Sequence, residues 1–289
     1  MIDARATVAV RHPTVFGEGP VWDARDATVW WVDMDGRELL GWSRREDRLR
    51  RFALERAPSA LVPAASGGFL VLSGRRCSRW RPGGTPQVYL ELDDAEDDVG
   101  FNDAKCDPRG RLWVGTVAED RRAGAGALYR IAAGRAERML DGITLSNGLG
   151  WSPDARTMYF VDTLTHRVDA FDFDAGRGRI DRRRSFHRVD PDDGLPDGLS
   201  VDAHGVVWLA LWGAGEVRAI APDGRVLGAV RLGVRSSTSC TFGGGDLQTL
   251  FVTTAGVGSG LPAAPDAGGL FATRVPVAGQ PVPLYACHA

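Results

Sequence analysis

The pattern of polar and hydrophobic positions in this 289-residue chain repeats six times. In each copy a short polar turn leads into a run of β-branched and aromatic residues, which is typical of a hairpin in an antiparallel sheet. The first residues of successive copies lie 42 to 48 positions apart. The copies are Asp23–Asp33, Ala65–Leu72, Asp107–Gly115, Asp154–Asp162, Asp202–Leu211 and Gly245–Thr253. This spacing is close to the roughly 40–50 residues of a four-stranded propeller blade.

A further apolar run follows four of the copies and predicts a third strand in those repeats. These runs are Arg37–Trp42, Gly126–Ile131, Arg167–Asp172 and Gly215–Ile220. No window sustains helical periodicity over a dozen residues. The pattern therefore predicts an all-β fold in which residues 1–289 form a single domain, a six-bladed β-propeller with four-stranded antiparallel blades. We expect the N-terminal strand Thr7–Val10 to close the ring by pairing with the last blade near Gly269–Ala272, which leaves no sheet edge open.

Short polar segments precede four of the tight turns at similar distances, five to seven residues before each turn. The segments are Gly17–Pro20, Phe101–Asp103, Ser146–Gly148 and Pro196–Gly198, and they contain Glu18, Asn102, Asn147 and Asp197. We expect these segments to be turns, and each alone is an ordinary turn sequence. Equivalent positions of a circular repeat face one common place, however. Their shared position therefore predicts a site at the mouth of the central channel.

The oxygen atoms of this expected site favour a hard cation. Glu18, Asn147 and Asp197 each lie beside a glycine, and no cysteine or histidine pair accompanies them. Such a set favours Ca²⁺, Mg²⁺ or Mn²⁺ over structural zinc. Three protein ligands leave coordination positions open for water and substrate, which a catalytic metal requires.

Charge and composition exclude several other classes of protein. The net charge is −2 with an isoelectric point near 6.2, and no basic stripe indicates nucleic-acid binding. No apolar run approaches the roughly 18 residues of a membrane span, so we expect no membrane association. The first residues lack the apolar core of a secretory signal. The cysteines lie far apart without a CxxC motif, and we expect free thiols in a cytoplasmic protein: Cys77, Cys106, Cys240 and Cys287.

Five ordered motifs resemble the senescence marker protein-30/gluconolactonase family, which includes regucalcin. The motifs are Gly17–Trp22, Asn102–Thr116, Ser146–Asp154, Pro196–Asp202 and Thr238–Asp246. The resemblance runs from about residue 15 to the C-terminus and implies a six-bladed propeller that hydrolyses sugar lactones to aldonic acids. It also implies one divalent cation held by Glu18, Asn147 and Asp197, foremost Ca²⁺, with Mg²⁺, Mn²⁺, Zn²⁺ or Fe²⁺ as alternatives.

The same resemblance places substrate-contacting roles on Asn102 and on Glu119. Some family members carry an arginine two residues before the asparagine, and this chain has Gly100 there. The missing guanidinium implies a different or smaller lactone, or another arginine in its place, such as Arg121 or Arg122.

The expected mechanism follows from the chemistry of these groups. A lactone carbonyl gains electrophilicity on a divalent cation. Asp197 is our candidate general base, because Glu18 is committed to the metal. One alternative is hydrolysis of an organophosphate or another ester on the same site. Another is a non-catalytic propeller that binds Ca²⁺ or another ligand. We expect a monomer or weak dimer whose partner is a small sugar lactone.

Three further features stay open at this stage. His166 either lines the channel mouth or occupies a hairpin turn. The acidic run Glu91–Asp98 is either a solvated loop or a lid near the metal. Lys105 follows Asn102 by three positions, so a strand period of two turns it away from Asn102 and favours a packing role over catalysis.

Overall fold

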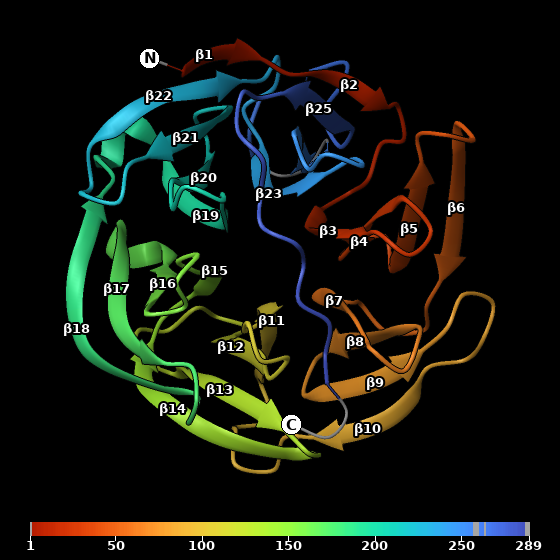
Figure 1. Ribbon diagram of the computed structural model, residues 1–289. Coiled ribbons are helices and arrows are strands. Elements are labelled where there is room, and N and C mark those ends of the chain that lie inside the picture. Colours follow the sequence, from red (N-terminus) through yellow and green to blue (C-terminus); the bar gives the residue numbers. More distant parts are fainter. Residues whose placement is uncertain (1, 257–259, 263, 287–289) are drawn as a thin grey trace.

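The computed structural model describes residues 2–256, 260–262 and 264–286. Within these ranges the strands form six sheets arranged as blades around a central channel, and the helical elements are two 3₁₀ turns (Figure 1). The six-bladed all-β fold is thus as the repeat predicted. The two turns are η1 (Thr163–Thr165) and η2 (Pro191–Asp193).

Each blade contributes one innermost strand to the wall of the channel. These strands are β3 (Gly17–Asp23), β7 (Ala60–Pro63), β11 (Val99–Cys106), β15 (Ser146–Trp151), β19 (Leu195–Val201) and β23 (Ser237–Gly243). Each pairs antiparallel with a second strand, and these second strands are the apolar runs of the sequence repeat. They are β4 (Thr28–Asp33), β8 (Phe69–Ser73), β12 (Leu112–Ala118), β16 (Thr157–Asp162), β20 (Val207–Trp212) and β24 (Thr249–Thr254).

Third and outer strands complete the blades. The third strands are β5 (Glu38–Ser43), β9 (Arg76–Trp80), β13 (Gly126–Ala132), β17 (Arg167–Asp174), β21 (Glu216–Ile220) and β25 (Leu270–Arg274). The outer strands are β6 (Arg48–Ala53), β10 (Gln87–Glu91), β14 (Arg135–Ile143), β18 (Arg179–Arg188), β22 (Val226–Arg231) and β2 (Thr7–Val10). The outer strands carry many exposed charged residues, which suits the edge of a sheet.

The N-terminal residues join the first and last parts of the chain. Strand β2 pairs antiparallel with β25, with Thr7 opposite Ala272 and Val8 opposite Phe271, as expected from the sequence. Just before it, β1 (Ile2–Arg5) adds a fifth strand, parallel to β22 of the neighbouring blade. This second pairing was not expected, and it spreads the N-terminal segment over two blades.

An aspartate begins several of the tight turns between the first and second strands, and its carboxylate organises the turn. The Oδ1 atom of Asp202 accepts the backbone N–H groups of His204 and Val206, while Oδ2 accepts the indole N–H of Trp208 at 3.0 Å. Asp107 makes the equivalent contact with the buried Trp113 at 3.1 Å. In these two blades the aspartate therefore ties the turn to a buried tryptophan.

The C-terminal segment crosses the channel (Figure 1), at the ends of the innermost strands that lie away from the bulged polar segments. Along its way Ala278 O accepts from Ala203, Gln280 Nε2 donates to Trp151 O at 2.9 Å, and Tyr285 exchanges backbone hydrogen bonds with Pro63 and Ala65. We call this segment, residues 278–286, the strap. It connects several blades and gives the channel a floor.

Candidate metal centre

The four polar segments of the sequence are not turns but bulges within the innermost strands. In β3 the pairing register shifts between Glu18 and Val21, and β11, β15 and β19 shift at the equivalent place. A bulge re-aims the side chains of a strand without ending it. The polar residues therefore belong to rigid sheet, and their common position in the repeat is a common bulge.

Asn102 and Asn147 meet directly at the channel mouth. The Nδ2 atom of Asn102 donates to Ser146 O at 2.7 Å and to Asn147 Oδ1 at 3.3 Å. Asn147 Nδ2 donates to the hydroxyl of Thr163 at 2.9 Å, and that hydroxyl donates to Pro196 O. These contacts fix the orientation of the Asn147 amide: its nitrogen donates to Thr163, and its oxygen accepts from Asn102.

Glycines let the innermost strands approach closely beside the site. A Cβ on Gly148 would lie 2.6 Å from Leu199 N and 2.7 Å from Asp197 O. A Cβ on Gly198 would lie 2.0 Å from the hydroxyl oxygen of Ser239. Since real Cβ atoms do not approach that closely, only glycine permits the spacing of β15, β19 and β23 at this level.

Glu18 and Asp197 form a buried carboxylate pair. Burial raises the pKa of Glu18 from its ordinary 4.5 to about 8, and the Asp103 carboxylate adds to the rise. Burial likewise raises the pKa of Asp197 well above its usual range, with the charges of Glu18 and then Asp103 contributing. The three carboxylates thus share one low-dielectric region, where their negative charges repel each other.

The polar atoms here fit a cation. In the part of the chain that the structure describes, Oδ1 of Asp197 is buried and has no hydrogen-bond partner. The Oε2 atom of Glu18 accepts the backbone N–H of Gly19, which holds this carboxylate at the start of β3. Among the described residues no three His, Cys, Asp or Glu side chains form a metal cluster by themselves, so an amide oxygen such as that of Asn147 has to complete the set. Hard divalent cations accept such mixed oxygen ligands.

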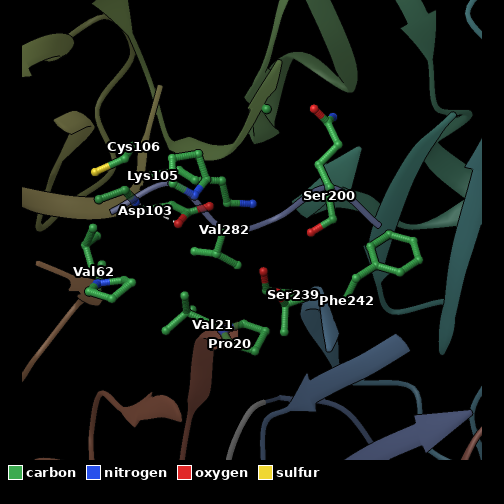
Figure 2. A pocket seen from close by; sticks show the side chains of 18 of the residues that line it. Pro20, Val21, Val62, Asp103, Lys105, Cys106, Ser200, Ser239, Phe242 and Val282 are labelled. Carbon is green, nitrogen blue, oxygen red and sulfur yellow. Dashed lines mark hydrogen bonds between the residues drawn. The ribbon is translucent and has the colours of Figure 1, made fainter. Parts of the chain in front are cut away.

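A cavity of about 100 Å³ lies on the axis between this site and the strap. Asp103 and Lys105 line it from β11, while Ser200 and Ser239 line it from β19 and β23 (Figure 2). The strap residues from Gln280 to Pro283 close it below. The walls of this cavity are mostly apolar, and these four polar side chains reach it from three blades.

Lys105 and Asp103 both line the axial cavity, whereas Asn102 does not, so Lys105 turns away from Asn102 as strand alternation predicted. The alternation alone did not indicate that this side of β11 faces the cavity. Asp103 was also passed over in favour of its neighbour Asn102, although it lies in the same polar segment and is 8% exposed.

Comparisons with known proteins identify the family of this chain. The family model for the SMP-30/Gluconolactonase/LRE-like region matches residues 16–256. The chain belongs to this family. Regucalcin of Sus scrofa is 34% identical over 282 residues, which cover 93% of this chain and 94% of that protein.

Solved structures of family members share the whole fold. A calcium-binding protein, regucalcin, from Agrobacterium tumefaciens has a TM-score of 0.91 at 30% identity and matches over 98% of both chains. A gluconolactonase from Xanthomonas campestris has a TM-score of 0.77 at 26% identity, covering 95% of this chain and 90% of its own. Family membership is consistent with lactone hydrolysis.

The residues that the family resemblance assigned to substrate lie in different settings. Asn102 contacts Ser146 and Asn147 at the site. Glu119 is exposed just after β12, and its backbone N–H donates to Asp98 O at 3.0 Å. A Cβ on Gly100 would lie 3.3 Å from Gly74 Cα, so a larger residue there would press on the neighbouring blade. Of the two loop arginines, Arg121 lies close enough for its charge to lower the pKa of Asp197, although burial and the carboxylates outweigh it.

The acidic run and His166 lie in connections between strands. Arg122 pairs with Glu96 and Asp98, and Arg75 pairs with Asp97 at 3.0 Å, so arginines hold the exposed acidic run. His166 has a φ of 54° and ends η1 in the turn between β16 and β17. His166 thus occupies the turn between β16 and β17, in the same short segment as Thr163, which contacts Asn147.

The structure bears on two expectations drawn from composition, the free cysteines and the absence of a membrane span. Cys77, Cys106 and Cys240 are free and buried, while Cys287 lies outside the described residues. Over the described ranges, no helix has the length and apolar character needed to cross a membrane.

Proposed function

We propose that this protein is a metal-dependent lactonase that opens a sugar lactone to its aldonic acid. The observation that carries the proposal is the buried Asp197 carboxylate, whose Oδ1 lacks a hydrogen-bond partner among the described residues, beside Glu18 and the two asparagines. Membership of the gluconolactonase family and the likeness to the Xanthomonas campestris gluconolactonase support the lactone as substrate.

Glu18, Asn147 and Asp197 would hold the cation, foremost Ca²⁺, through side-chain oxygens. A bound divalent cation supplies Lewis acidity that polarises a lactone carbonyl. The likeness to a calcium-binding regucalcin supports Ca²⁺ over the other candidate metals. The donors are all oxygens, which suits a hard cation.

Asp197 is the proposed general base. Oδ1 of its buried carboxylate has no hydrogen-bond partner among the described residues, so this oxygen can accept a proton from water. Its carboxylate takes a proton from the attacking water and returns it to the ring oxygen that leaves as the lactone opens. Both transfers occur at one carboxylate, so the enzyme returns to its starting state without a second acid.

Asn102 orients the sugar. Its Nδ2 is already used by Ser146 O and Asn147 Oδ1, so its Oδ1 remains to accept a hydrogen bond from a sugar hydroxyl. Glu119 is proposed as an acceptor at the rim, where its exposure lets it engage an outer hydroxyl after substrate enters. Several fixed acceptors are what a polyol pocket requires.

A panel of substrates tests the proposal. Acid release is followed with five- and six-carbon aldonolactones and with one phosphotriester, with Ca²⁺ and with excess chelator. We expect turnover of an aldonolactone that needs the metal. Turnover of the phosphotriester alone would favour the organophosphate alternative. Tight Ca²⁺ binding without turnover of any substrate would instead favour the non-catalytic binder.

A further inference from the structure

Lys105 is the only lysine in a chain that otherwise uses arginine. All but one of its 35 Lys and Arg residues are arginines. A lysine ammonium is a compact point charge, whereas a guanidinium is a planar fork that needs more space and more acceptors. The single lysine of the chain lines the axial cavity.

The ammonium of Lys105 is held by backbone rather than by a carboxylate. Its Nζ donates to Leu199 O on β19 at 2.6 Å, two residues beyond Asp197. Within the described ranges no salt bridge joins Lys105 to an acidic side chain. Asp103 and Lys105 extend toward the same cavity from one strand (Figure 2). The positive charge is therefore fixed near the axis and acts on the acidic groups through space.

Three carboxylates and this ammonium occupy the buried part of the channel. Glu18, Asp103 and Asp197 act electrostatically on one another, and Lys105 acts on Glu18 and Asp103. When all four groups are ionised, three carboxylates and one ammonium give a net charge of −2. Two negative charges are balanced by one divalent cation, and burial makes such balance important because uncompensated charge is costly there.

We propose that Lys105 is a specificity-determining residue which, together with Asp103, sets the charge of the channel so that the site matches a divalent rather than a trivalent cation. This inference rests on the metal centre of the proposed function. Lys105 needs no contact with the cation for this role, because Coulomb interactions act over several ångströms in a buried region.

The test measures cation selectivity without using catalysis. Calorimetric titrations of the chelator-stripped protein with CaCl₂ and with LaCl₃, at one pH in a non-coordinating buffer, give the ratio of La³⁺ to Ca²⁺ association constants. Both ions displace protons from the same carboxylates, so proton competition largely cancels in the ratio. The variants are Lys105→Met, Asp103→Asn and the double variant that combines them. Lys105→Arg is the charge-retaining control, and Ser200→Ala removes a neutral polar group from the same cavity.

Charge matching predicts an ordered pattern. The La³⁺ to Ca²⁺ ratio should rise on the order of tenfold in Lys105→Met and fall on the order of tenfold in Asp103→Asn. The double variant, which restores two negative charges, should return to within about threefold of the wild type. Lys105→Arg and Ser200→Ala should keep the wild-type ratio. If Lys105→Met does not fold while the double variant folds with the wild-type ratio, the charge balance is also supported.

Two failures are distinguishable. If the wild-type protein binds neither ion, the metal centre of the proposed function is wrong. If it binds Ca²⁺ but Asp103→Asn and Lys105→Met leave the ratio unchanged, or shift it in the same direction, only the role of Lys105 is overturned.

Discussion

Asp197 is the residue on which the proposed chemistry depends most. Its carboxylate is buried, its Oδ1 is unpaired among the described residues, and its pKa is raised by burial and by Glu18. An unpaired buried acceptor costs stability, so its presence calls for a ligand. The neighbouring Asn102 is neutral and already hydrogen-bonded, which gives it a smaller role.

Substitution separates these two roles. Asp197→Asn should abolish measurable turnover, with a loss of at least about 10²–10⁴ in rate, because it removes a ligand charge and the base together. Asn102→Ala should mainly raise KM, since it removes one neutral contact. Steady-state kinetics on an aldonolactone check both. Near-wild-type kcat in Asp197→Asn, with metal still bound, would show that another group is the base.

The buried carboxylates also make the metal-free protein sensitive to pH. The pKa of Glu18 is raised from 4.5 to about 8, so the folded state keeps protons that the unfolded chain has released. The free energy of unfolding should therefore fall as pH rises from about 4.5 to 8 in the presence of chelator. Urea denaturation at several pH values measures it.

The control for this pH dependence is Glu18→Gln. Burial lowers the pKa of His187, which acts in the opposite direction below about pH 6.5, and both proteins share that contribution. The free energy of unfolding of the wild type minus that of Glu18→Gln should decline as pH rises. Saturating Ca²⁺ should largely remove this decline. A difference that rises with pH would contradict the assignment of Glu18.

At the scale of strands, the bulges in β3, β11, β15 and β19 place the site. The period of the second strands and the equivalence of the four polar segments were predictable, because turn residues and apolar runs leave a clear pattern. The bulges were not, since Gly-rich polar segments are typical of turns as well as of irregular strands. Alternation placed Lys105 on the opposite side of β11 from Asn102, but it gave no sign that this side faces a cavity, although its being the only lysine was a usable signal.

Close strand packing at Gly148 predicts a local defect on substitution. The added Cβ of Gly148→Ala meets backbone atoms of β19, which cannot rotate away, so β15 and β19 must separate beside Asn147 and Asp197. We expect a loss of about 1–3 kcal/mol in unfolding free energy and weaker Ca²⁺ binding. Gly233→Ala is the matched control, because its Cβ meets nothing within 4 Å. Equal effects of the two substitutions would show that this spacing does not support the site.

At the scale of the whole molecule, both ends of the chain fasten the ring. The sequence predicted the pairing of β2 with β25 but not the parallel addition of β1, nor the strap across the channel. These segments are short and lack a repeat partner, so no periodic signal marks them. The strap is held by individual contacts, of which Tyr285, fully buried between blades, is the largest.

Truncation of Tyr285 should therefore loosen the assembly. Tyr285→Ala should cost about 3–5 kcal/mol, since a large buried aromatic is lost. Tyr285→Phe keeps the ring and loses the 3.0 Å hydroxyl contact with Tyr89, so it should cost only about 1 kcal/mol. Chemical denaturation measures both. If the alanine variant is as stable as the phenylalanine variant, the strap does not hold the blades together.

The central claim is that one divalent cation at Glu18, Asn147 and Asp197 makes this propeller a lactonase. The most direct measurement is a titration of chelator-stripped protein with Ca²⁺ while the initial rate of glucono-lactone hydrolysis is recorded above the spontaneous rate. We expect the rate to rise linearly and level off at one equivalent of Ca²⁺, and Asp197→Asn to show no rise. Full turnover by the stripped protein in excess chelator would contradict the claim.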